Sequence, residues 1–315
     1  MRTTKQILRG EELNDFLLHS YLNFGTFYKR ILGYKYEEFL KEMSDLVDRY
    51  RLTCFMAPRG HGKTTLVTGK VLHMLLYQKN KKILFLAHKK DTAKDNLVEM
   101  QTIIETNQLL KETLKPEKKS HLDWSKFGME TKTGCKVVVK ANSPSARGGH
   151  YDFIFADEVG EYLDVSAFYG VVQPMVVAKK GKICAIGTPR SKMDLLHELG
   201  RDNRYCSKKY QAINSVGEAL TNRITIDELR NIKSAYEKQG KLLEWEREYM
   251  CNPVSDETSL FSYDHVVRTY DKEGSFLHKG ESHKRYFMGA DFAISSKSGA
   301  DYSVFTVIEV DSHNN

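Results

Sequence analysis

The chain has 315 residues, a formal net charge of +7 and five cysteines without a C-x-x-C pair, so a zinc site is not indicated. Its 41% hydrophobic and 11% aromatic content supplies a core and argues against a disordered chain. No apolar run reaches the roughly 18 residues of a membrane span, and the N-terminus lacks the apolar core of a signal peptide. These features favour a cytosolic enzyme with reduced thiols, and the basic charge permits a nucleic-acid partner without specifying one.

The first part of the chain predicts helices, a strand, a glycine-rich turn and a further helix, in that order. Aromatic and aliphatic side chains at helical spacing predict helices over 11–50, and an apolar run predicts a strand over 52–56. The turn Ala-Pro-Arg-Gly-His-Gly-Lys-Thr-Thr occupies 57–65, and a helix-like segment follows over 66–76. A strand, a glycine-rich turn with Gly-Lys-Thr and a helix together are the context of a phosphate-binding P-loop.

The residues of this turn suit a nucleotide. Backbone N–H groups and the partial positive charge of the helix N-terminus would hold the phosphates. Lys63 would reach the β- and γ-phosphates, and the Thr64 hydroxyl would take a Mg²⁺ position. The usual pattern opens with glycine, whereas this chain has Ala57, but the Gly-x-Gly-Lys-Thr core is intact. The predicted nucleotide-binding residues are Gly60, His61, Gly62, Lys63, Thr64 and Thr65.

Further apolar runs predict a layered α/β fold. Buried strands are expected at 82–88, 135–140, 151–158 and 182–189, with a helix at about 91–105 and an amphipathic stretch over 167–177. Strands that alternate with helices indicate a mainly parallel sheet flanked by helices on both faces.

The strand run 151–158 ends in two adjacent carboxylates, Asp157 and Glu158. At the carboxyl end of a parallel strand, Asp157 would hold Mg²⁺ and Glu158 would polarise a water for attack on the γ-phosphate. Beside a P-loop, this acidic pair predicts a P-loop ATPase of the ASCE type, whose catalytic glutamate lies on a separate strand from the loop.

Four further features carry a family resemblance. They are Arg59 inside the P-loop, a Ser-Ala-Arg-Gly-Gly element at 145–149, Gly-Thr-Pro at 187–189 and a Glu-Trp-Glu-Arg-Glu segment at 244–248 that leads to Pro253. With them, the chain resembles the large terminase subunit of tailed bacteriophages, a DNA-packaging motor, over roughly residues 20–311.

The resemblance implies a catalytic set of Glu158, Arg147, Arg59 and Thr188. Arg59 could fold over its own γ-phosphate, whereas Arg147 could reach the nucleotide of a neighbouring subunit in a ring. We expect Arg147 to act in trans and Arg59 to assist in cis, and an arginine finger contributes about 10³- to 10⁵-fold in rate. Thr188 would couple hydrolysis to movement. Adenine contacts stay open, with three aromatic candidates: Phe27, Tyr28 and Tyr36.

The resemblance also divides the chain. An ATPase domain is expected over 1–253, with a helical N-terminal part to about residue 50 and a helical lid or linker part from about 190. A linker over 254–285 and the first hairpin of an incomplete RNase H-like nuclease over 286–315 would follow. Asp291 and Asp301 match metal-binding acids of that nuclease, which would use Mg²⁺ or Mn²⁺. Because the remaining acids are absent before residue 315, we expect that this chain alone does not cut DNA.

The implied function is an ATP- and Mg²⁺-dependent motor that moves double-stranded DNA into a procapsid in the host cytoplasm. Its implied partners are duplex DNA, a portal protein, a small terminase subunit and further copies in a ring, with no membrane. A superfamily-two-like helicase is one alternative, but 191–285 is short for its second motor domain. The other is a nucleotide-dependent DNA-binding docking component without motor activity. Lysine clusters at 79–82, 89–90 and 179–182 could contact DNA phosphates or form ordinary solvated faces.

Overall fold

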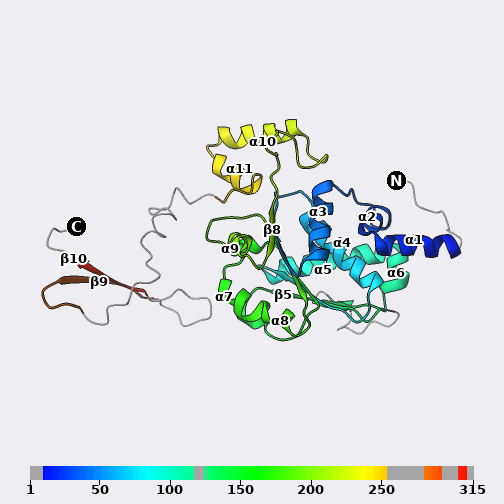
Figure 1. Ribbon diagram of the computed structural model, residues 1–315, viewed down its shortest axis with the longest axis horizontal. Helices are drawn as coiled ribbons and strands as arrows, with labels where there is room; N and C mark the ends of the chain where they lie inside the picture. Colours follow the sequence, from blue (N-terminus) through cyan, green and yellow to red (C-terminus); the bar gives the residue numbers. More distant parts are fainter. Residues whose placement is uncertain (1–9, 117–123, 126, 254–279, 293–303, 311–315) are drawn as a thin grey trace. The chain divides into compact units, whose positions relative to one another are not determined.

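The computed structural model describes residues 10–116, 124–125, 127–253, 280–292 and 304–310, and the chain divides into two compact units, Met1–Tyr263 and Asp264–Asn315. The first unit is built on one eight-stranded sheet (Figure 1). In spatial order its strands are β3 (Trp124–Ser125), β4 (Gly128–Glu130), β5 (Lys136–Ala141), β2 (Lys82–Ala87), β6 (Phe153–Ala156), β7 (Lys182–Gly187), β1 (Leu52–Met56) and β8 (Cys206–Lys209).

All neighbouring strands from β5 to β8 are parallel, and only β3 and β4 run antiparallel at one edge. The expected α/β fold with a mainly parallel sheet is therefore confirmed. In the register, Met56 lies opposite Gly187, and Leu86 lies opposite Ala156. The residues that follow β1, β2, β6 and β7 consequently meet at one edge of the sheet, which is where ligands bind in open α/β sheets.

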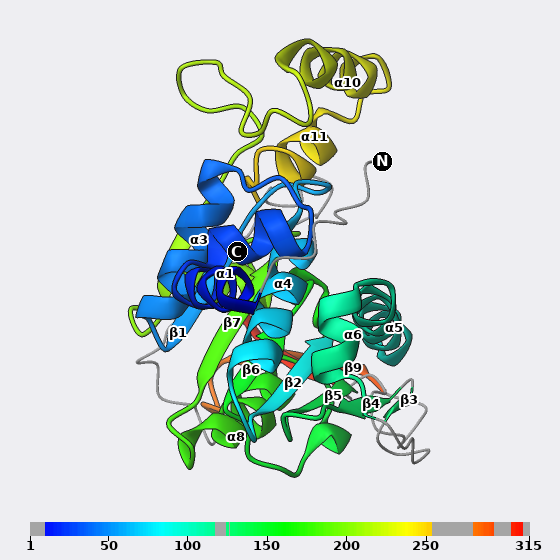
Figure 2. The same cartoon turned by 90° about the vertical axis from the view of Figure 1, so that its right-hand side faces the viewer.

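Helices cover both faces of this sheet, because the inner strands are apolar on both sides (Figure 2). In β6, Phe153 and Phe155 join one core cluster, while Ile154 and Ala156 join the other. The first cluster is covered by α1 (Gly10–Leu22), α2 (Phe24–Thr26), η1 (Phe27–Ile31), α3 (Glu38–Arg49), α4 (Lys63–Tyr77), α5 (Lys90–Thr106) and α6 (Gln108–Leu114). The second is covered by η2 (Pro144–Ala146), η3 (Val159–Glu161), α7 (Val165–Ala167), η4 (Phe168–Val172), α8 (Pro174–Val177) and α9 (Leu195–Arg201).

The N-terminal helices pack against α4, the helix that follows the P-loop. A Cβ at Gly69 would lie 2.9 Å from the Tyr28 ring, so this glycine permits the close approach. Phe27 and Tyr28 are fully buried in the core, and Tyr36 is half-buried and contacts Tyr28. Burial raises the pKa of Tyr28 to about 12. These aromatic residues therefore have core positions, and Phe27 in particular presents no surface to a ligand.

Residues 210–253 form a small subdomain, which we call the lid. It contains α10 (Ile226–Lys238) and α11 (Leu242–Glu248), which lie apart from the sheet in Figures 1 and 2. A capping box between Thr225 and Glu228 starts α10, and buried Trp245 stacks on Tyr249 at 4.5 Å between ring centroids. The buried members of its core are Ala212, Leu229 and Trp245.

The second unit contains the antiparallel pair β9 (Arg285–Asp291) and β10 (Val304–Val310). The expected pairing of two strands in this region is confirmed, with Asp291 opposite Val304. Asp301 and most of the expected linker, 254–279, lie outside the described residues. Both strands expose apolar side chains, including Phe287, Met288, Phe305 and Ile308.

Several boundaries differ from those predicted. The acidic-pair strand ends at Ala156 and the next strand ends at Gly187, so the carboxylates and Thr188 lie in the turns beyond them. The amphipathic stretch over 167–177 consists of short α and π segments. The sequence did not predict β3 and β4, which are short, or β8, which is polar. Within the described part of the chain, no helix has the length and apolar character needed to cross a bilayer.

Candidate active site

The P-loop lies between β1 and α4 and has the backbone that its glycines allow. Gly60 and Gly62 have φ of 76° and 83°, which residues with a side chain rarely adopt. The ammonium of Lys63 donates to the carbonyl oxygens of Ala57 and Pro58 at 2.7 and 2.8 Å and to the Thr188 hydroxyl at 3.3 Å. Burial lowers the pKa of Lys63. This cation thus lies against its own loop and has no carboxylate at ion-pair distance in the described structure.

Asp157 lies directly opposite the start of α4. Its Oδ2 accepts a hydrogen bond of 3.0 Å from the Thr64 hydroxyl, and its Oδ1 accepts one of 2.9 Å from the Glu158 backbone N–H. The side chain is 3% exposed, and burial raises its pKa to about 6, from 3.8. The hydroxyl and carboxylate predicted as metal ligands are therefore adjacent, and for the ionised carboxylate the effect of burial outweighs the charge of nearby Lys63.

Glu158 has a left-handed backbone, with φ of 52°, and its side chain projects from the turn after β6. Its Oε2 lies 3.0 Å from Nδ1 of His88, the residue that follows β2. Sequence reasoning did not single out His88. The sequence places His88 at the end of a predicted strand, but it does not show that β2 and β6 are neighbours, which is what brings His88 to Glu158.

The two candidate arginines have different surroundings. The Arg59 side chain is 83% exposed and lies 4.0 Å from Glu248, and its backbone N–H donates to the Glu248 carbonyl oxygen at 3.1 Å. The end of α11 therefore contacts the P-loop. Arg147 is exposed after η2, and its guanidinium makes no hydrogen bond or ion pair within the described part of the chain.

The backbone of the loop that carries Arg147 is held by the ammonium group of one lysine. Lys140, near the end of β5, donates to the carbonyl oxygens of Ala146, Arg147 and Gly148 at 2.7, 3.4 and 3.1 Å. The loop is therefore fixed at its backbone, while the guanidinium of Arg147 extends from it without a partner in the described structure.

Thr188 follows β7 and touches the P-loop on its inner side. Its hydroxyl donates to the Ala57 carbonyl oxygen at 3.1 Å and accepts from Lys63. Of the predicted catalytic residues, Thr188 and Glu158 therefore lie at the same sheet edge as Lys63, Thr64 and Asp157. The remaining loop residue of note is His61, which is 2% exposed and donates from Nδ1 to the Arg59 carbonyl oxygen at 2.8 Å.

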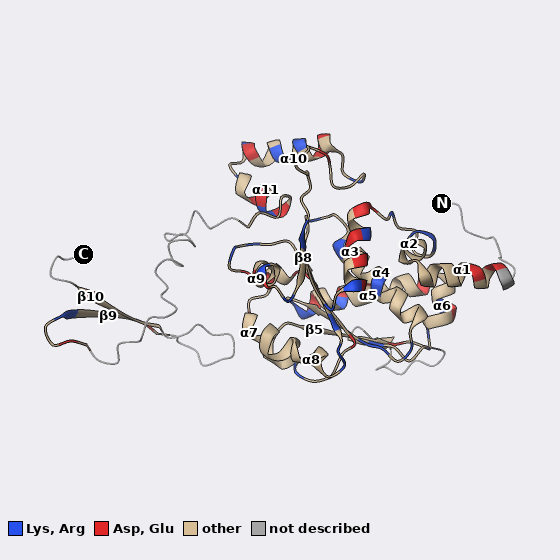
Figure 3. Cartoon of the chain, viewed as in Figure 1, with Lys and Arg blue, Asp and Glu red and all other residues tan. Residues whose placement is uncertain are grey.

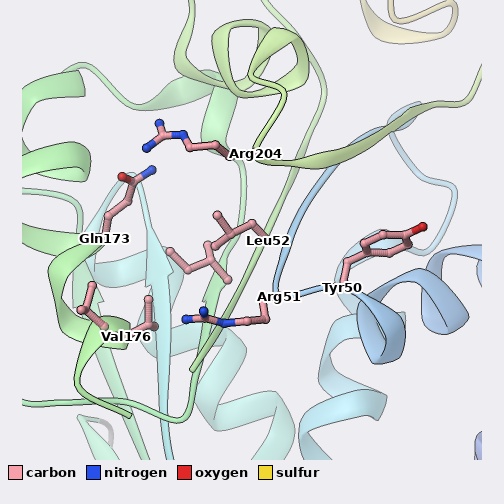
Figure 4. A pocket seen from close by; sticks show the side chains of 8 residues that line it. Tyr50, Arg51, Leu52, Gln173, Val176 and Arg204 are labelled. Atoms are coloured by element: carbon pink, nitrogen blue, oxygen red, sulfur yellow. The ribbon is translucent and has the colours of Figure 1, made fainter. Parts of the chain in front are cut away.

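A cavity of about 400 Å³ lies elsewhere on the first unit, beside the first residues of β1 and β7. Figure 4 shows Arg204 and Gln173 on its upper side, Arg51 and Val176 on its lower side, and Leu52 between them. It lies at the opposite end of these strands from the P-loop, so it is separate from the candidate active site.

The lysine clusters fall into two places. Those at 79–82 and 179–182 meet at the first residues of β2 and β7, where Asp152 lies 3.8 Å from Lys81 and 2.8 Å from Lys179. The pair at 89–90 lies after β2, near the candidate active site. Acidic and basic side chains both lie along α10 in Figure 3, so this helix carries a mixed surface rather than a basic one.

Comparisons with known proteins agree with this geometry. Residues 54–268 match the family described as terminase large subunit, T4likevirus-type, N-terminal. Among solved structures, the large terminase ATPase domain of Thermus phage P74-26 is similar at 14% identity and a TM-score of 0.55, covering 72% of this chain and 97% of that domain.

Two whole large terminases are also similar. That of bacteriophage HK97 has 15% identity and a TM-score of 0.59, covering 92% of this chain and 67% of that one. That of a thermophilic bacteriophage, solved in complex with ADP, has 11% identity and a TM-score of 0.51, covering 88% of this chain and 66% of that one. This chain thus matches about two thirds of their length. With its P-loop, its acidic pair and a family match over most of its length, the chain belongs to the terminase large subunit family.

Proposed function

We propose that this chain is the ATP-hydrolysing motor of a viral DNA-packaging machine and couples hydrolysis to translocation of double-stranded DNA into a procapsid. The observation that carries the proposal is the meeting of Lys63, Thr64, Asp157 and Thr188 at one edge of a parallel sheet. The match to the terminase large subunit family supports the same function.

The residues present fit a magnesium–nucleotide complex rather than a bare metal ion. In the described structure no three His, Cys, Asp or Glu side chains form a metal cluster, whereas Thr64 and Asp157 supply two adjacent oxygen atoms. Mg²⁺ at such sites takes one or two protein ligands and completes its shell with water and phosphate oxygens. Bound there, Mg²⁺ neutralises charge on the β- and γ-phosphates. Lys63 would exchange its two carbonyl acceptors for phosphate oxygens.

Glu158 is the proposed base that orients the attacking water, and its 3.0 Å contact with His88 would have to open for that role. Thr188 is proposed to report the γ-phosphate, because its hydroxyl already contacts the Lys63 ammonium. Replacing Thr188 by alanine should leave nucleotide binding intact and uncouple hydrolysis from DNA movement. Unchanged packaging by that variant would end this assignment.

Arg147 is the proposed trans-acting finger, and its unpaired, exposed guanidinium supports that role. Arg59 is proposed to assist in cis. Rings mixed from Arg147→Ala and Glu158→Ala chains test the assignment, because a trans finger on one chain can act on the intact site of another. Failure of the two defects to complement at any mixing ratio would remove the trans role.

The proposed partners are duplex DNA, a portal protein, a small terminase subunit and further copies of the chain in a ring, in the host cytoplasm. Contacts to DNA would be made through phosphates, so binding should weaken steeply with salt. Asp291, the last residue of β9, is proposed as a metal ligand of a nuclease site. This chain alone is expected not to cut DNA, and metal-dependent nicking by the wild-type chain that is lost in Asp291→Ala would contradict that expectation.

The decisive experiment measures phosphate release from MgATP by the 315-residue chain, with and without duplex DNA. Hydrolysis stimulated by DNA is expected in the wild type. It should be lost in Lys63→Ala, which removes the phosphate ligand, and in Glu158→Gln, which keeps the shape but removes the base. Hydrolysis that is absent in the wild type, or equal in Lys63→Ala, would overturn the proposal.

A further inference from the structure

An arginine from the lid lies against the P-loop, and no sequence motif pointed to it. A Cβ built on Gly62 would lie 3.1 Å from Nη1 of Arg223 and 3.7 Å from its central carbon. The guanidinium therefore packs on the bare Cα of the residue that precedes Lys63. Its Nη2 donates to the Lys35 carbonyl oxygen at 3.2 Å, so the side chain spans from the lid, past the P-loop, to the N-terminal part.

The backbone that presents Arg223 is anchored. Leu220 packs against the main core, and the buried hydroxyl of Thr221 accepts the Arg223 backbone N–H at 2.9 Å. The capping box of Thr225 then starts α10. Arg223 thus lies shortly before α10, in the part of the lid that packs on the body of the domain, and its exposed side chain reaches the P-loop from a defined position.

The charges around the loop are unbalanced. Arg59 and Arg247 both lie near the carboxylate of Glu248. Lys63 and Arg223, in contrast, donate to oxygen atoms of carbonyl or hydroxyl groups and have no carboxylate at ion-pair distance in the described residues. Two cations that flank a phosphate-binding turn without an anionic partner are an arrangement that a bound polyphosphate would complete.

A second polar group beside Arg223 also lacks a partner. Nε2 of the buried His61 has no hydrogen bond in the described structure, since its Nδ1 carries the proton given to the Arg59 carbonyl oxygen. Burial lowers the pKa of His61 against the hydrogen bond to the Arg59 carbonyl oxygen, and the charges of Lys63 and Arg223 lower it as well. The neighbourhood of Arg223 therefore combines two cations that have no carboxylate partner with a buried nitrogen that has no hydrogen bond in the described structure.

We propose that Arg223 is a nucleotide-binding residue that the lid supplies to the active site, where its guanidinium binds the phosphate chain of ATP or ADP beside Gly62. This inference rests on the proposed function and names a ligand of that same site. Arginine suits the role because its planar fork donates two parallel hydrogen bonds to phosphate oxygens. Nucleotide would thereby hold the lid segment against the P-loop and replace the hydrogen bond to Lys35.

The experiment measures equilibrium binding of MgADP by calorimetry to the wild-type chain and to Arg223→Ala. Losing a charge-assisted contact should weaken ADP about 10- to 100-fold. Arg223→Lys, which keeps the charge but loses the fork, should recover only part of the affinity. Arg230→Ala is the matched control, because Arg230 is an exposed lid arginine that pairs with Asp227, and it should bind as the wild type does.

Two further readouts separate the phosphate contact from other roles. The ratio of ATP to GTP affinity should be the same in the wild type and in Arg223→Ala, because the proposed contact is not to the base; a changed ratio would overturn the proposal. In the wild-type chain, saturating MgADP should protect Arg223 from an arginine-selective dicarbonyl reagent, read by peptide mass. Absence of protection would overturn the proposal even if Arg223→Ala failed to fold.

The outcomes also distinguish this inference from the function on which it rests. A wild-type chain that binds no MgADP and releases no phosphate from ATP would defeat both. A wild-type chain that binds MgADP, with Arg223→Ala binding equally well, would leave the motor function standing and remove Arg223 from its nucleotide site.

Discussion

Replacing Asp157 by asparagine should stabilise the nucleotide-free protein while it abolishes Mg²⁺-dependent hydrolysis. The buried carboxylate accepts from the Thr64 hydroxyl and from the Glu158 N–H. An asparagine can keep both contacts, since its oxygen accepts from the backbone and its amide nitrogen donates to the rotated hydroxyl. The substitution therefore removes the cost of the buried charge and keeps one hydrogen bond at each of the two terminal atoms of the side chain.

The magnitude follows from the pKa of Asp157, which burial raises from 3.8 to about 6. Between these values the folded state binds more protons than the unfolded state, so the free energy of unfolding falls as the pH rises through this window. The cost of ionising Asp157 is then about 1.5 kcal/mol at pH 5 and about 3 kcal/mol above pH 7. Asp157→Asn should gain up to that amount.

Urea unfolding of both chains between pH 5 and pH 8, in EDTA, measures the difference. The gap between Asp157→Asn and the wild type should roughly double from pH 5 to pH 7. Asp152→Asn is the control of opposite sign: although burial opposes it, hydrogen bonds from Lys179 and from the Lys82 N–H lower the pKa of Asp152. That variant should be less stable at pH 7, and its deficit should shrink on acidification. An Asp157→Asn chain that is less stable at every pH, or a gap that is independent of pH, would refute the reasoning.

Two other substitutions test the supports of the site. Gly160→Ala places a Cβ 2.5 Å from the Thr188 carbonyl oxygen, so it should lower the free energy of unfolding by about 1–3 kcal/mol and lower the ATPase rate. Gly170→Ala is the control, because Gly170 has open space around it. Equal melting temperatures of the two variants would contradict the packing argument. Trp245→Ala removes the buried ring of the lid core and should destabilise the lid by about 3–5 kcal/mol. Amide hydrogen exchange should then be faster in α10 and α11 and unchanged in the sheet. Exchange in α10 and α11 equal to that of the wild type would show that the lid does not depend on this residue.

Much of the architecture was accessible from the sequence because the signals were local. The P-loop, its flanking strand and helix, and the acidic pair after an apolar run are each read from a short stretch of chain, and parallel strands bring their ends to one edge. That reasoning placed Lys63, Thr64 and Asp157 together, as the structure has them. The polar strand β8 and the short strands β3 and β4 give no comparable apolar pattern.

The contacts that sequence reasoning missed are non-local. Arg223 is separated from Gly62 in the sequence by most strands of the sheet, and nothing in its surrounding residues marks it. His88 meets Glu158 only because β2 and β6 are spatial neighbours, although the two residues are far apart in the sequence. The sequence also could not separate an aromatic residue that contacts adenine from one in the core, because both occur at helical spacing. Phe27, one of the candidates, belongs to the core.

The grip of Lys140 on the Arg147 loop has a consequence for how copies of the chain would work together. The ammonium of Lys140 binds three carbonyl oxygens of this loop, which restricts movement of the loop backbone. In the proposed trans role, the reach of Arg147 toward a neighbouring copy would be set by the distance between the two domains rather than by movement of this loop. In a ring of copies, the order in which the sites hydrolyse ATP would accordingly depend on how closely neighbouring domains approach.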